Sequence, residues 1–345
     1  MKKSDVCRDL KKQKYGLVGE HSAVQVCHWT KNSLRGKSGC WKEKFYGIKS
    51  HECCQVSVSL FNCENKCVHC WRNTEYSIAN EVQDPEDPEK IVDGLIEERK
   101  KLLMGFGGND KTLKKKFQDA LLPSLFTFSL TGEATLYPRL GEMIRLLRKR
   151  DIITFLVTNG QNPEAILKLA HARVSPDGQK KENDLPTQLT ISTNAPNKEL
   201  FNRWHNSAKK DAWDKFNETL KIISKLKGKC RRCVRLTLVQ PGKQGIKSLN
   251  DITNMTDELV SQYAEMINMA QPDFVHVKGY TSIGHARARM GYDKMPWFKD
   301  VNEYAKKILK ELQKTDANWK ILGSEERSCV VVIGKSKKDM KIKKA

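Results

Sequence analysis

The sequence predicts an α/β protein in which helices cover a mainly parallel sheet. Apolar strand-like runs alternate six times with segments of helical periodicity, and this alternation is typical of parallel β/α units. Hydrophobic residues make up 39% of the chain and charged residues 30%, which fits a folded globular protein and excludes wholesale disorder. Six units can close only part of a barrel, and a doubly wound sheet is the alternative that periodicity does not separate from it.

The predicted elements follow one another in regular order from residue 55 onward. Strands are expected at 55–60, 125–130, 152–157, 187–192, 233–239 and 274–278, with one more at 329–333. Helices are expected at 88–105, 139–150, 163–171, 255–270 and 301–313, with helical material between the fourth and fifth strands up to residue 226. The polar stretch 172–184 is expected to be a surface loop.

The two ends of the chain differ from this central array. Residues 1–54 carry spaced Cys, Trp, Gly and Lys but few periodic apolar positions, so we expect an extension whose order comes from something other than its own core. Residues 335–345 contain six Lys and one Asp and are expected to form a flexible basic arm. We therefore divide the chain into an N-terminal extension (1–54), a core (55–290) and a C-terminal part (291–345).

The charge of the chain indicates a polyanionic partner. Lys and Arg number 62 against 41 Asp and Glu, which gives a net charge of +21 over 345 residues, and nucleic acid is the first candidate for such an excess. No window of about 20 residues is free of charge, which excludes a transmembrane helix. The basic first 14 residues are not followed by an apolar segment, so no secretory signal is expected and the predicted location is the cytoplasm.

A short loop after the first predicted strand carries three cysteines with the spacing C-x3-C-x2-C, namely Cys63, Cys67 and Cys70. Structural zinc sites usually have four protein ligands. An iron–sulfur cubane held by three cysteines leaves its fourth iron open for another ligand. We favour the cubane, and the alternative is a zinc knuckle completed by His69 or by a distant residue.

A second set of cysteines lies in the N-terminal extension. Cys27, Cys40 and Cys53 are separated by 13 residues each time, and the adjacent Cys54 leaves the third position ambiguous. A metal centre held by these residues would order the extension, because metal-binding energy can serve as folding energy. The alternative is three buried free thiols.

The first cysteine loop, placed after the first strand of a β/α array, resembles the radical S-adenosylmethionine (SAM) superfamily. The resemblance implies a partial (β/α)6 radical-SAM barrel with an N-terminal cysteine-rich extension and a short C-terminal α/β extension. His69 stands where many members carry an aromatic residue. Thr131, Gly132 and Glu133 resemble the segment that binds the methionyl amine of SAM, and by the same resemblance Asn159, Ser192 and Asn194 at two strand ends line the SAM or substrate pocket.

The second cysteine set sharpens this resemblance. Cys27, the run Gly39 to Lys42 and the run His51 to Cys53, together with Lys278, Gly279 and Tyr280 near the C-terminal end, are similar to the archaeal-type tRNA 4-demethylwyosine synthases. That family implies a second 4Fe–4S cluster on Cys27, Cys40 and Cys53, with Cys53 a better match than Cys54. It also implies that Lys42 is a candidate for binding pyruvate.

The family resemblance implies a lyase of wybutosine biosynthesis with two 4Fe–4S clusters and SAM. A radical derived from SAM takes a hydrogen from the methyl group of an N1-methylguanosine next to the anticodon of tRNA-Phe. The carbon radical then adds to pyruvate, which is held at the second cluster or by Lys42, and loss of the carboxyl carbon and ring closure give the tricyclic base. The expected reductant is an external ferredoxin or flavodoxin, and the expected state is a monomer.

Two other functions stay open from the sequence. One is a radical SAM enzyme that acts on a different RNA or on a peptide, and the other is a zinc-stabilised, non-catalytic RNA-binding protein. The residues that contact RNA and those that transfer protons are not assigned, and Lys278, Arg287 and Arg289 are candidates for either RNA or SAM carboxylate contacts.

Overall fold

The computed structural model describes residues 2–174, 181–242 and 252–342, and its centre is a ten-stranded sheet. Six strands in the middle of this sheet are parallel and follow one another in chain order without a reversal. They are β3 (Cys53–Ser57), β4 (Leu125–Phe128), β5 (Ile153–Thr158), β8 (Gln188–Ser192), β9 (Arg231–Leu238) and β10 (Phe274–Gly279). Because a doubly wound sheet reverses its strand order, this arrangement confirms the partial (β/α)6 barrel.

Antiparallel strands extend both edges of the barrel sheet. β2 (Ser22–Gln25) pairs with β3 and carries β1 (Tyr15–Val18), while β12 (Val330–Gly334) pairs with β10 and carries β11 (Lys320–Glu325). A separate short hairpin consists of β6 (Arg173–Val174) and β7 (Lys181–Glu182). It lies in the expected surface loop 172–184, of which residues 175–180 are outside the described part of the chain.

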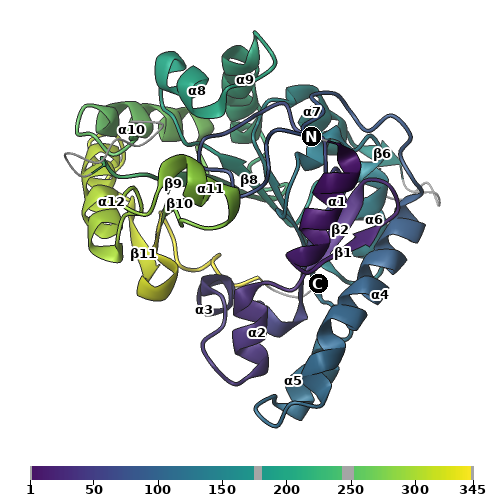
Figure 1. Cartoon of the computed structure of the whole chain (residues 1–345). Helices are drawn as coiled ribbons and strands as arrows, with labels where there is room; N and C mark the ends of the chain where they lie inside the picture. Colours follow the sequence, from purple (N-terminus) through teal and green to yellow (C-terminus); the bar gives the residue numbers. More distant parts are fainter. Residues whose placement is uncertain (1, 175–180, 243–251, 343–345) are drawn as a thin grey trace.

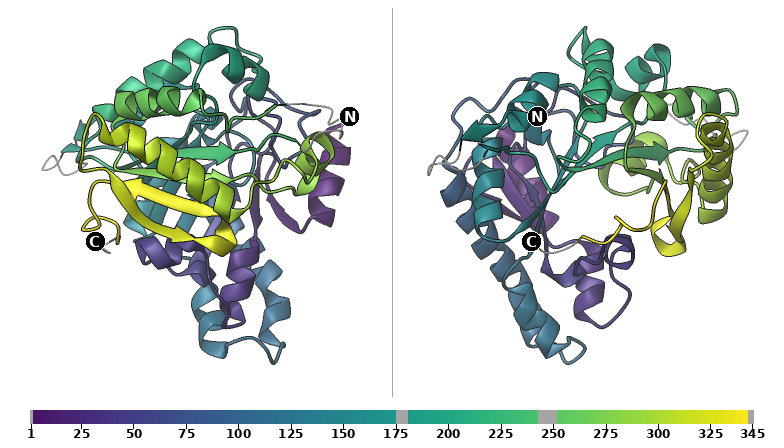
Figure 2. Two further views of the ribbon diagram at one scale, coloured as in Figure 1. Left: turned by 90° about the vertical axis from the view of Figure 1, so that its left-hand side faces the viewer. Right: turned by 180° about the vertical axis from the view of Figure 1, so that it is seen from behind.

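Helices surround the outside of the curved sheet, as Figure 1 shows. They are α4 (Pro88–Gly107), α6 (Leu140–Lys149), α7 (Pro163–Ala170), α8 (Lys198–His205), α9 (Ala212–Ser224), α10 (Leu259–Ala270) and α12 (Phe298–Gln313). The other helices are α1 (Lys3–Lys12), α2 (His28–Leu34), α3 (Trp41–Tyr46), α5 (Lys114–Ala120) and α11 (Gly284–Met290). The views in Figure 2 place α4 on one flank of the molecule and α12 with β11 on the other.

Alternation along the strands divides the apolar residues between two cores. One set faces the outer helices, and it includes Val56 of β3, Phe128 of β4 and Leu236 of β9, which are at most 1% exposed. Successive side chains of a strand point to opposite faces, so the intervening residues face the inside of the barrel. Inside, Cys53, Leu125, Phe155, Cys233 and Phe274 pack against Phe45 and Tyr46 of α3, which close the end of the barrel where the parallel strands begin.

The expectation that the order of the N-terminal extension comes from something other than its own core was wrong. Helix α1 and the β1–β2 hairpin bury Val6, Leu10, Tyr15 and Ala23 together with Phe61 from the cysteine loop region. The strands of this hairpin have four residues each, which is too short for a clear period in the sequence. Their stability comes from non-local pairing, because β2 aligns with β3 and extends the main sheet.

The first and fifth parallel strands begin earlier than the sequence predicts. The first begins at Cys53 instead of residue 55, so Cys53 belongs to the sheet. The fifth begins at Arg231, because the charges that interrupt the apolar pattern are compensated. The guanidinium of Arg232 lies 2.7 Å from an oxygen of Asp273, and that of Arg231 lies 4.8 Å from the ring centres of Tyr46 and Phe274.

The basic tail is not a free arm over its described length. Met340 is 6% exposed and packs with the core around Tyr46, and the amide of Ile342 donates to the carbonyl of Tyr46 at 2.9 Å. Arg231 donates to the carbonyls of Asp339 and Met340, which ties the tail to β9. Residues 343–345 lie outside the described part. Among the described helices, none has the length and apolar character that crossing a membrane requires.

Candidate active site

The first cysteine loop lies directly after β3 and is partly buried. Partial burial raises the pKa of Cys63 to about 12 and raises that of Cys67 well above its usual value, while the guanidinium of Arg72 acts in the opposite direction. Arg72 also donates to the carbonyl of Asn65, and Arg289 of α11 donates to the carbonyls of Val68 and Cys70. Two arginines therefore hold the loop and offer positive charge to its thiolates.

The spacing of the sulfur atoms argues against a single zinc ion. In tetrahedral zinc with Zn–S bonds of about 2.3 Å, two ligand sulfurs lie roughly 3.8 Å apart. Among the described residues, the only three His, Cys, Asp or Glu ligand atoms that all lie within 4.8 Å of one another belong to His51, Glu52 and Asp119. In each cysteine set at least one pair of sulfurs is therefore more than 4.8 Å apart, a separation that suits a cubane, in which each cysteine would bind a different iron.

The segment Thr131 to Glu133 lies against the cysteine loop. The amide of Glu133 donates to the carbonyl of Asn62 at 2.8 Å, and the hydroxyl of Thr131 donates to the carbonyl of Leu60 at 3.1 Å. Gly132 has φ +73°, and a Cβ there would lie 1.9 Å from the carbonyl oxygen of Ser59. Only glycine permits this approach, so the segment is held next to the position where the sequence predicts SAM.

Asn159 joins the same network through two buried carboxyl groups. Its amide donates to Glu133 Oε2 at 2.7 Å, and its side chain donates to Oε2 of Glu64 in the cysteine loop at 3.0 Å. Burial and the nearby charge of Glu64 raise the pKa of Glu133 to about 7. The structure therefore brings the predicted residues of the second and third strand ends to the first cysteine loop.

The two residues predicted at the fourth strand end are used differently. Ser192 faces the inside of the barrel, where its hydroxyl accepts a hydrogen bond from Arg235 at 3.1 Å. Asn194 is 2% exposed, and its side-chain oxygen accepts from the amide of Thr237 at 3.1 Å. The Asn194 side chain thus fixes the neighbouring strand ends, and a contact of it with a cofactor stays a prediction.

The second cysteine set meets on the inner side of the barrel. Cys27 precedes α2, Cys40 precedes α3 and Cys53 begins β3. Ser50 lies between the first two: its carbonyl accepts from Thr30, whose hydroxyl contacts Cys27 Sγ at 3.4 Å, and its hydroxyl accepts from the amide of Cys40 at 2.7 Å. Burial raises the pKa of Cys40 to about 11, with Lys42 acting in the opposite direction. Cys54 points the other way, into the core under the outer helices.

Lys42 lies among these three cysteines. Its Nζ is 3.5 Å from the hydroxyl of Thr127 and 5.4 Å from the ring centre of Phe155. Burial lowers the pKa of Lys42, but the thiolates of Cys53, Cys40 and Cys27 outweigh this effect and raise the pKa. Cys53 Sγ lies 3.6 Å from the same Thr127 hydroxyl, so the lysine and the cysteine meet at one point on β4.

Several residues of this inner surface have no counterpart in the predicted site. They are Thr127 on β4, Arg235 on β9 and His276 on β10. His205 on α8 was also missed; it lies beside the first cysteine loop, where its Nδ1 is 3.1 Å from Cys67 Sγ. The signal for Arg235 is a charge in the middle of an apolar strand, between Val234 and Leu236. Lys278 and Arg289, left open between RNA and SAM, both donate to backbone carbonyls within the fold.

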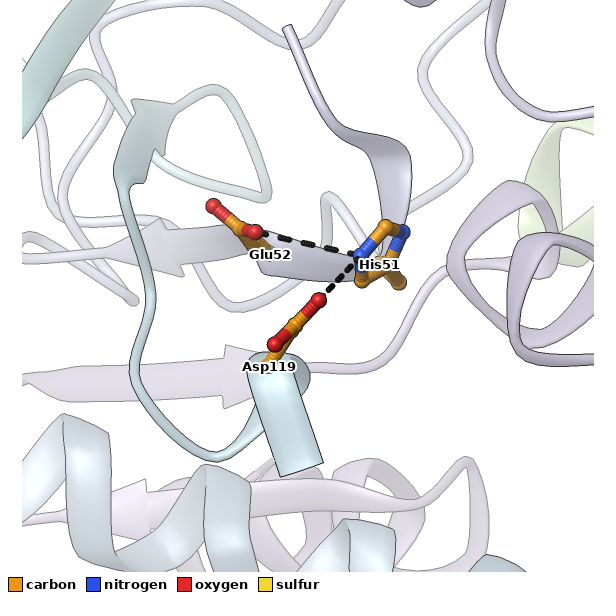
Figure 3. Close-up of side chains that lie close together, drawn as sticks. All are labelled: His51, Glu52 and Asp119. Carbon is orange, nitrogen blue, oxygen red and sulfur yellow. Dashed lines mark ion pairs between the residues drawn. The ribbon is translucent and has the colours of Figure 1, made fainter. Parts of the chain in front are cut away.

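Figure 3 shows His51, Glu52 and Asp119, where η1 (Ser50–Glu52) meets α5. His51 Nε2 lies 3.8 Å from Glu52 Oε1 and 3.8 Å from Asp119 Oδ2. Lys49 Nζ lies 2.6 Å from the same Glu52 oxygen, so this carboxylate already has a cationic partner. We therefore interpret the group as an ion-pair cluster that joins α5 to the segment leading into Cys53.

Comparisons with known sequences agree with this geometry. Residues 58–245 match the radical SAM superfamily, and residues 269–335 match the family described as wyosine base formation. An S-adenosyl-L-methionine-dependent tRNA 4-demethylwyosine synthase of Pyrococcus abyssi is 38% identical over 89% of this chain and 83% of its own length. A mouse synthase of the same name is 34% identical over 95% of this chain, which spans 41% of that longer relative.

Solved structures give the same result. A structure of TYW1 with a lysine–pyruvate adduct bound superimposes with a TM-score of 0.78 and 28% identity over 99% of this chain and 98% of the other. Archaeal TYW1 superimposes with a TM-score of 0.72 and 27% identity, over 99% of this chain and 100% of the other. The resemblance stated from the motifs is confirmed: the chain belongs to the radical SAM superfamily and, within it, to the family of the S-adenosyl-L-methionine-dependent tRNA 4-demethylwyosine synthases.

Proposed function

We propose that this protein joins pyruvate to the N1-methylguanosine next to the anticodon of tRNA-Phe and so forms the tricyclic base 4-demethylwyosine. The names of the relatives support the reaction. The observation that carries the proposal is the position of Lys42 among Cys27, Cys40 and Cys53 on the inner side of a radical SAM barrel. This position supplies a second reactive centre in addition to the cysteine loop that follows β3.

Cys63, Cys67 and Cys70 are proposed to bind a 4Fe–4S cluster together with SAM. Such a cluster supplies the electron that cleaves SAM reductively. Thr131, Gly132, Glu133, Asn159, Ser192 and Asn194 are proposed to form the SAM pocket. In this pocket Glu133 orients Asn159, and Gly132 permits the backbone to approach the cysteine loop.

Cys27, Cys40 and Cys53 are proposed to bind a second 4Fe–4S cluster, with Cys54 excluded because it faces the outer core. The test is the iron and sulfide content after oxygen-free reconstitution. The unaltered protein is expected to hold about eight irons, and a variant with serine at all three positions about four. Cys54→Ser is the matched control and is expected to retain about eight. Loss of iron in the control but not in Cys53→Ser would contradict the assignment.

Lys42 is proposed to hold pyruvate as an imine. Its amine adds to the C2 carbonyl of pyruvate, and the carbonyl oxygen leaves as water, so that the C2–nitrogen double bond replaces the C2–oxygen double bond. The solved TYW1 with a lysine–pyruvate adduct supports this choice over pyruvate held by iron. Thr127 and Phe155 hold the side chain in place.

The decisive experiment combines the reconstituted protein with SAM, a reductant, pyruvate and N1-methylated tRNA-Phe. Nucleoside mass spectrometry is expected to show 4-demethylwyosine, and Lys42→Met is expected to abolish this product while SAM cleavage continues. SAM cleavage without the tricyclic product would instead indicate a radical SAM enzyme with another substrate. Zinc without sulfide in the purified protein would indicate a zinc-stabilised RNA-binding protein.

The surroundings of the reaction are proposed on general grounds. Lysine and arginine side chains hold the anticodon stem through its phosphates, in line with the net charge of +21. The target base leaves its stack to reach the barrel. An external reductant such as a ferredoxin or a flavodoxin supplies the electron, and the enzyme works as a monomer in the cytoplasm.

A further inference from the structure

Arg235 occupies the centre of the inner barrel surface. It lies on β9, aligned with Ser192 of β8 on one side and His276 of β10 on the other, so these three side chains share one face of the sheet. Arg235, Ser192, Lys42 and Lys278 are all partly exposed, and a small molecule can therefore touch them. Neither the sequence motifs nor the proposed function gives Arg235 a role.

The guanidinium of Arg235 has donors to spare and no acidic partner. One nitrogen donates to Ser192 Oγ at 3.1 Å, while the buried Nε has no hydrogen-bond partner. Within the described residues no carboxylate pairs with it, and burial alone lowers its pKa to about 10. A guanidinium removed from water without an anion is costly, so this site favours a ligand that brings a negative charge.

The neighbours of Arg235 add to the need for an anion. His276, aligned with Arg235, and Lys278, two residues further along β10, share its face of the sheet, and the ring of Trp41, the residue before Lys42, lies 4.9 Å from that of His276. Lys278 is already engaged, since its Nζ donates to the carbonyl of Ser328 at 2.7 Å. Among the described residues of this surface, Arg235 is therefore a cation with unused donors that can bind a ligand.

We propose that Arg235 binds the carboxylate of pyruvate while Lys42 holds its carbonyl carbon. The proposal rests on the proposed function of Lys42. In the imine, a single carbon atom separates the carboxylate carbon from the lysine nitrogen. The carboxylate therefore stays next to Lys42, and the cation that binds it must also lie close to Lys42. The planar fork of an arginine matches the two oxygens of a carboxylate, and the hydrogen bond to Ser192 fixes the fork in advance.

Reductive trapping tests the proposal. Borohydride converts the imine to a stable N-(1-carboxyethyl) group on Lys42, which peptide mass mapping quantifies as a function of pyruvate concentration. Arg235→Met is expected to raise the half-saturating pyruvate concentration by about 10- to 100-fold. Trapping of pyruvamide, which has no carboxylate, is expected to be the same in the variant and in the unaltered enzyme.

Lys278→Met is the matched control, because it removes one positive charge from the same surface. The proposal requires a clearly smaller effect for this variant, and equal effects of the two variants would reduce Arg235 to a general electrostatic contribution. Arg235→Lys keeps the charge without the fork and is expected to give an intermediate effect. If Arg235→Met does not fold, this lysine variant provides the comparison between pyruvate and pyruvamide.

Two further outcomes separate the possible errors. The carboxylate of SAM is the other anion that Arg235 could bind, and equilibrium dialysis of SAM with the reconstituted enzyme measures this. Weaker SAM binding together with unchanged pyruvate trapping in Arg235→Met would assign Arg235 to SAM. Failure of the unaltered enzyme to form any Lys42 adduct would overturn the proposed role of Lys42, and with it the role of Arg235. Normal trapping in Arg235→Met would overturn only the role of Arg235.

Discussion

Replacement of Gly132 by alanine tests how the predicted SAM segment is held against the cysteine loop. Gly132 has φ +73°, and an added Cβ would meet the carbonyl oxygen of Ser59 at 1.9 Å and that of Asn62 at 3.1 Å. Both oxygens belong to backbone at the end of β3 and in the cysteine loop, so they cannot move aside as a flexible side chain would. The segment and the loop must separate by about 1.5 Å before the first contact reaches an ordinary distance.

The expected change in stability is the sum of three costs and one gain. A left-handed conformation costs an alanine roughly 1–2 kcal/mol, and the stiffer unfolded chain returns roughly 0.4–1 kcal/mol. Overpacking adds about 1–3 kcal/mol, and separation lengthens the hydrogen bond from Glu133 to Asn62, worth about 1 kcal/mol. We therefore expect Gly132→Ala to lower the free energy of unfolding by about 2–5.5 kcal/mol.

Gly228 provides a matched control. It has φ +78°, and an added Cβ there meets nothing within 4 Å, so alanine has the same backbone cost without the contact. Urea unfolding of both variants, metal-free and under reducing conditions, is expected to show a loss of about 1 kcal/mol or less for Gly228→Ala. Equal stabilities of the two variants would refute the reasoning, because the contact with Ser59 would then have no energetic consequence.

Three further predictions concern buried polar residues. Burial, followed by the charges of Arg235, Arg231 and Lys42, lowers the pKa of His276 from 6.5 to about 3. The unfolded chain thus binds this proton first, and the free energy of unfolding falls as the pH drops below about 6.5. In His276→Gln this fall is expected to be shallower by up to about 1.4 kcal/mol per pH unit, and an unchanged slope would contradict the assignment. Arg99→Met removes the donors to the carbonyls of His51 and Ala120 and is expected to cost about 2–5 kcal/mol in urea unfolding, with faster hydrogen exchange in α5; protection equal to that of the unaltered protein would argue against the contact. His205→Leu removes a hydrogen bond to Cys67 Sγ and is expected to lower the reduction potential of the first cluster in a redox titration followed by electron paramagnetic resonance, whereas a potential that stays the same would show that the contact has no such role.

The parallel array was predictable because its pattern is local. Each barrel strand carries apolar residues that face the outer helices, and the matching helices show their own period, so strands such as Ile153–Thr158 and helices such as Pro163–Ala170 were predicted within one or two residues. The N-terminal hairpin Tyr15–Gln25 was missed because its strands are held by pairing with β3, which leaves no period in a four-residue strand. The described part of the basic tail, up to Ile342, was missed for a similar reason, since its contacts are with α3 and β9, far away in the sequence.

Those residues of the candidate site were predictable that form motifs with a fixed spacing along the sequence. The cysteines were recognised because thiols clustered at these intervals are typical of a metal centre. Arg235 and His205 were not recognised, because they come close to the cysteines and to Lys42 only when β9 and α8 are placed in the barrel. Asn194 illustrates the converse: its position at a strand end suggested a ligand, while its side chain is engaged with the backbone of Thr237.

The choice between Cys53 and Cys54 depends on the outer core more than on the cysteines themselves. Cys54 and Val56 are both fully buried under the outer helices, and Cys53 is therefore fixed on the opposite face, beside Thr127 and Lys42. A slip of β3 by one residue relative to β4 would exchange the two thiols, but it would also turn Val56 and Val58 out of the outer core. The burial of these valines opposes the slip by about 1.5–3 kcal/mol each. Apolar residues of the outer core thus decide which sulfur faces the inside of the barrel, where the second metal centre is proposed.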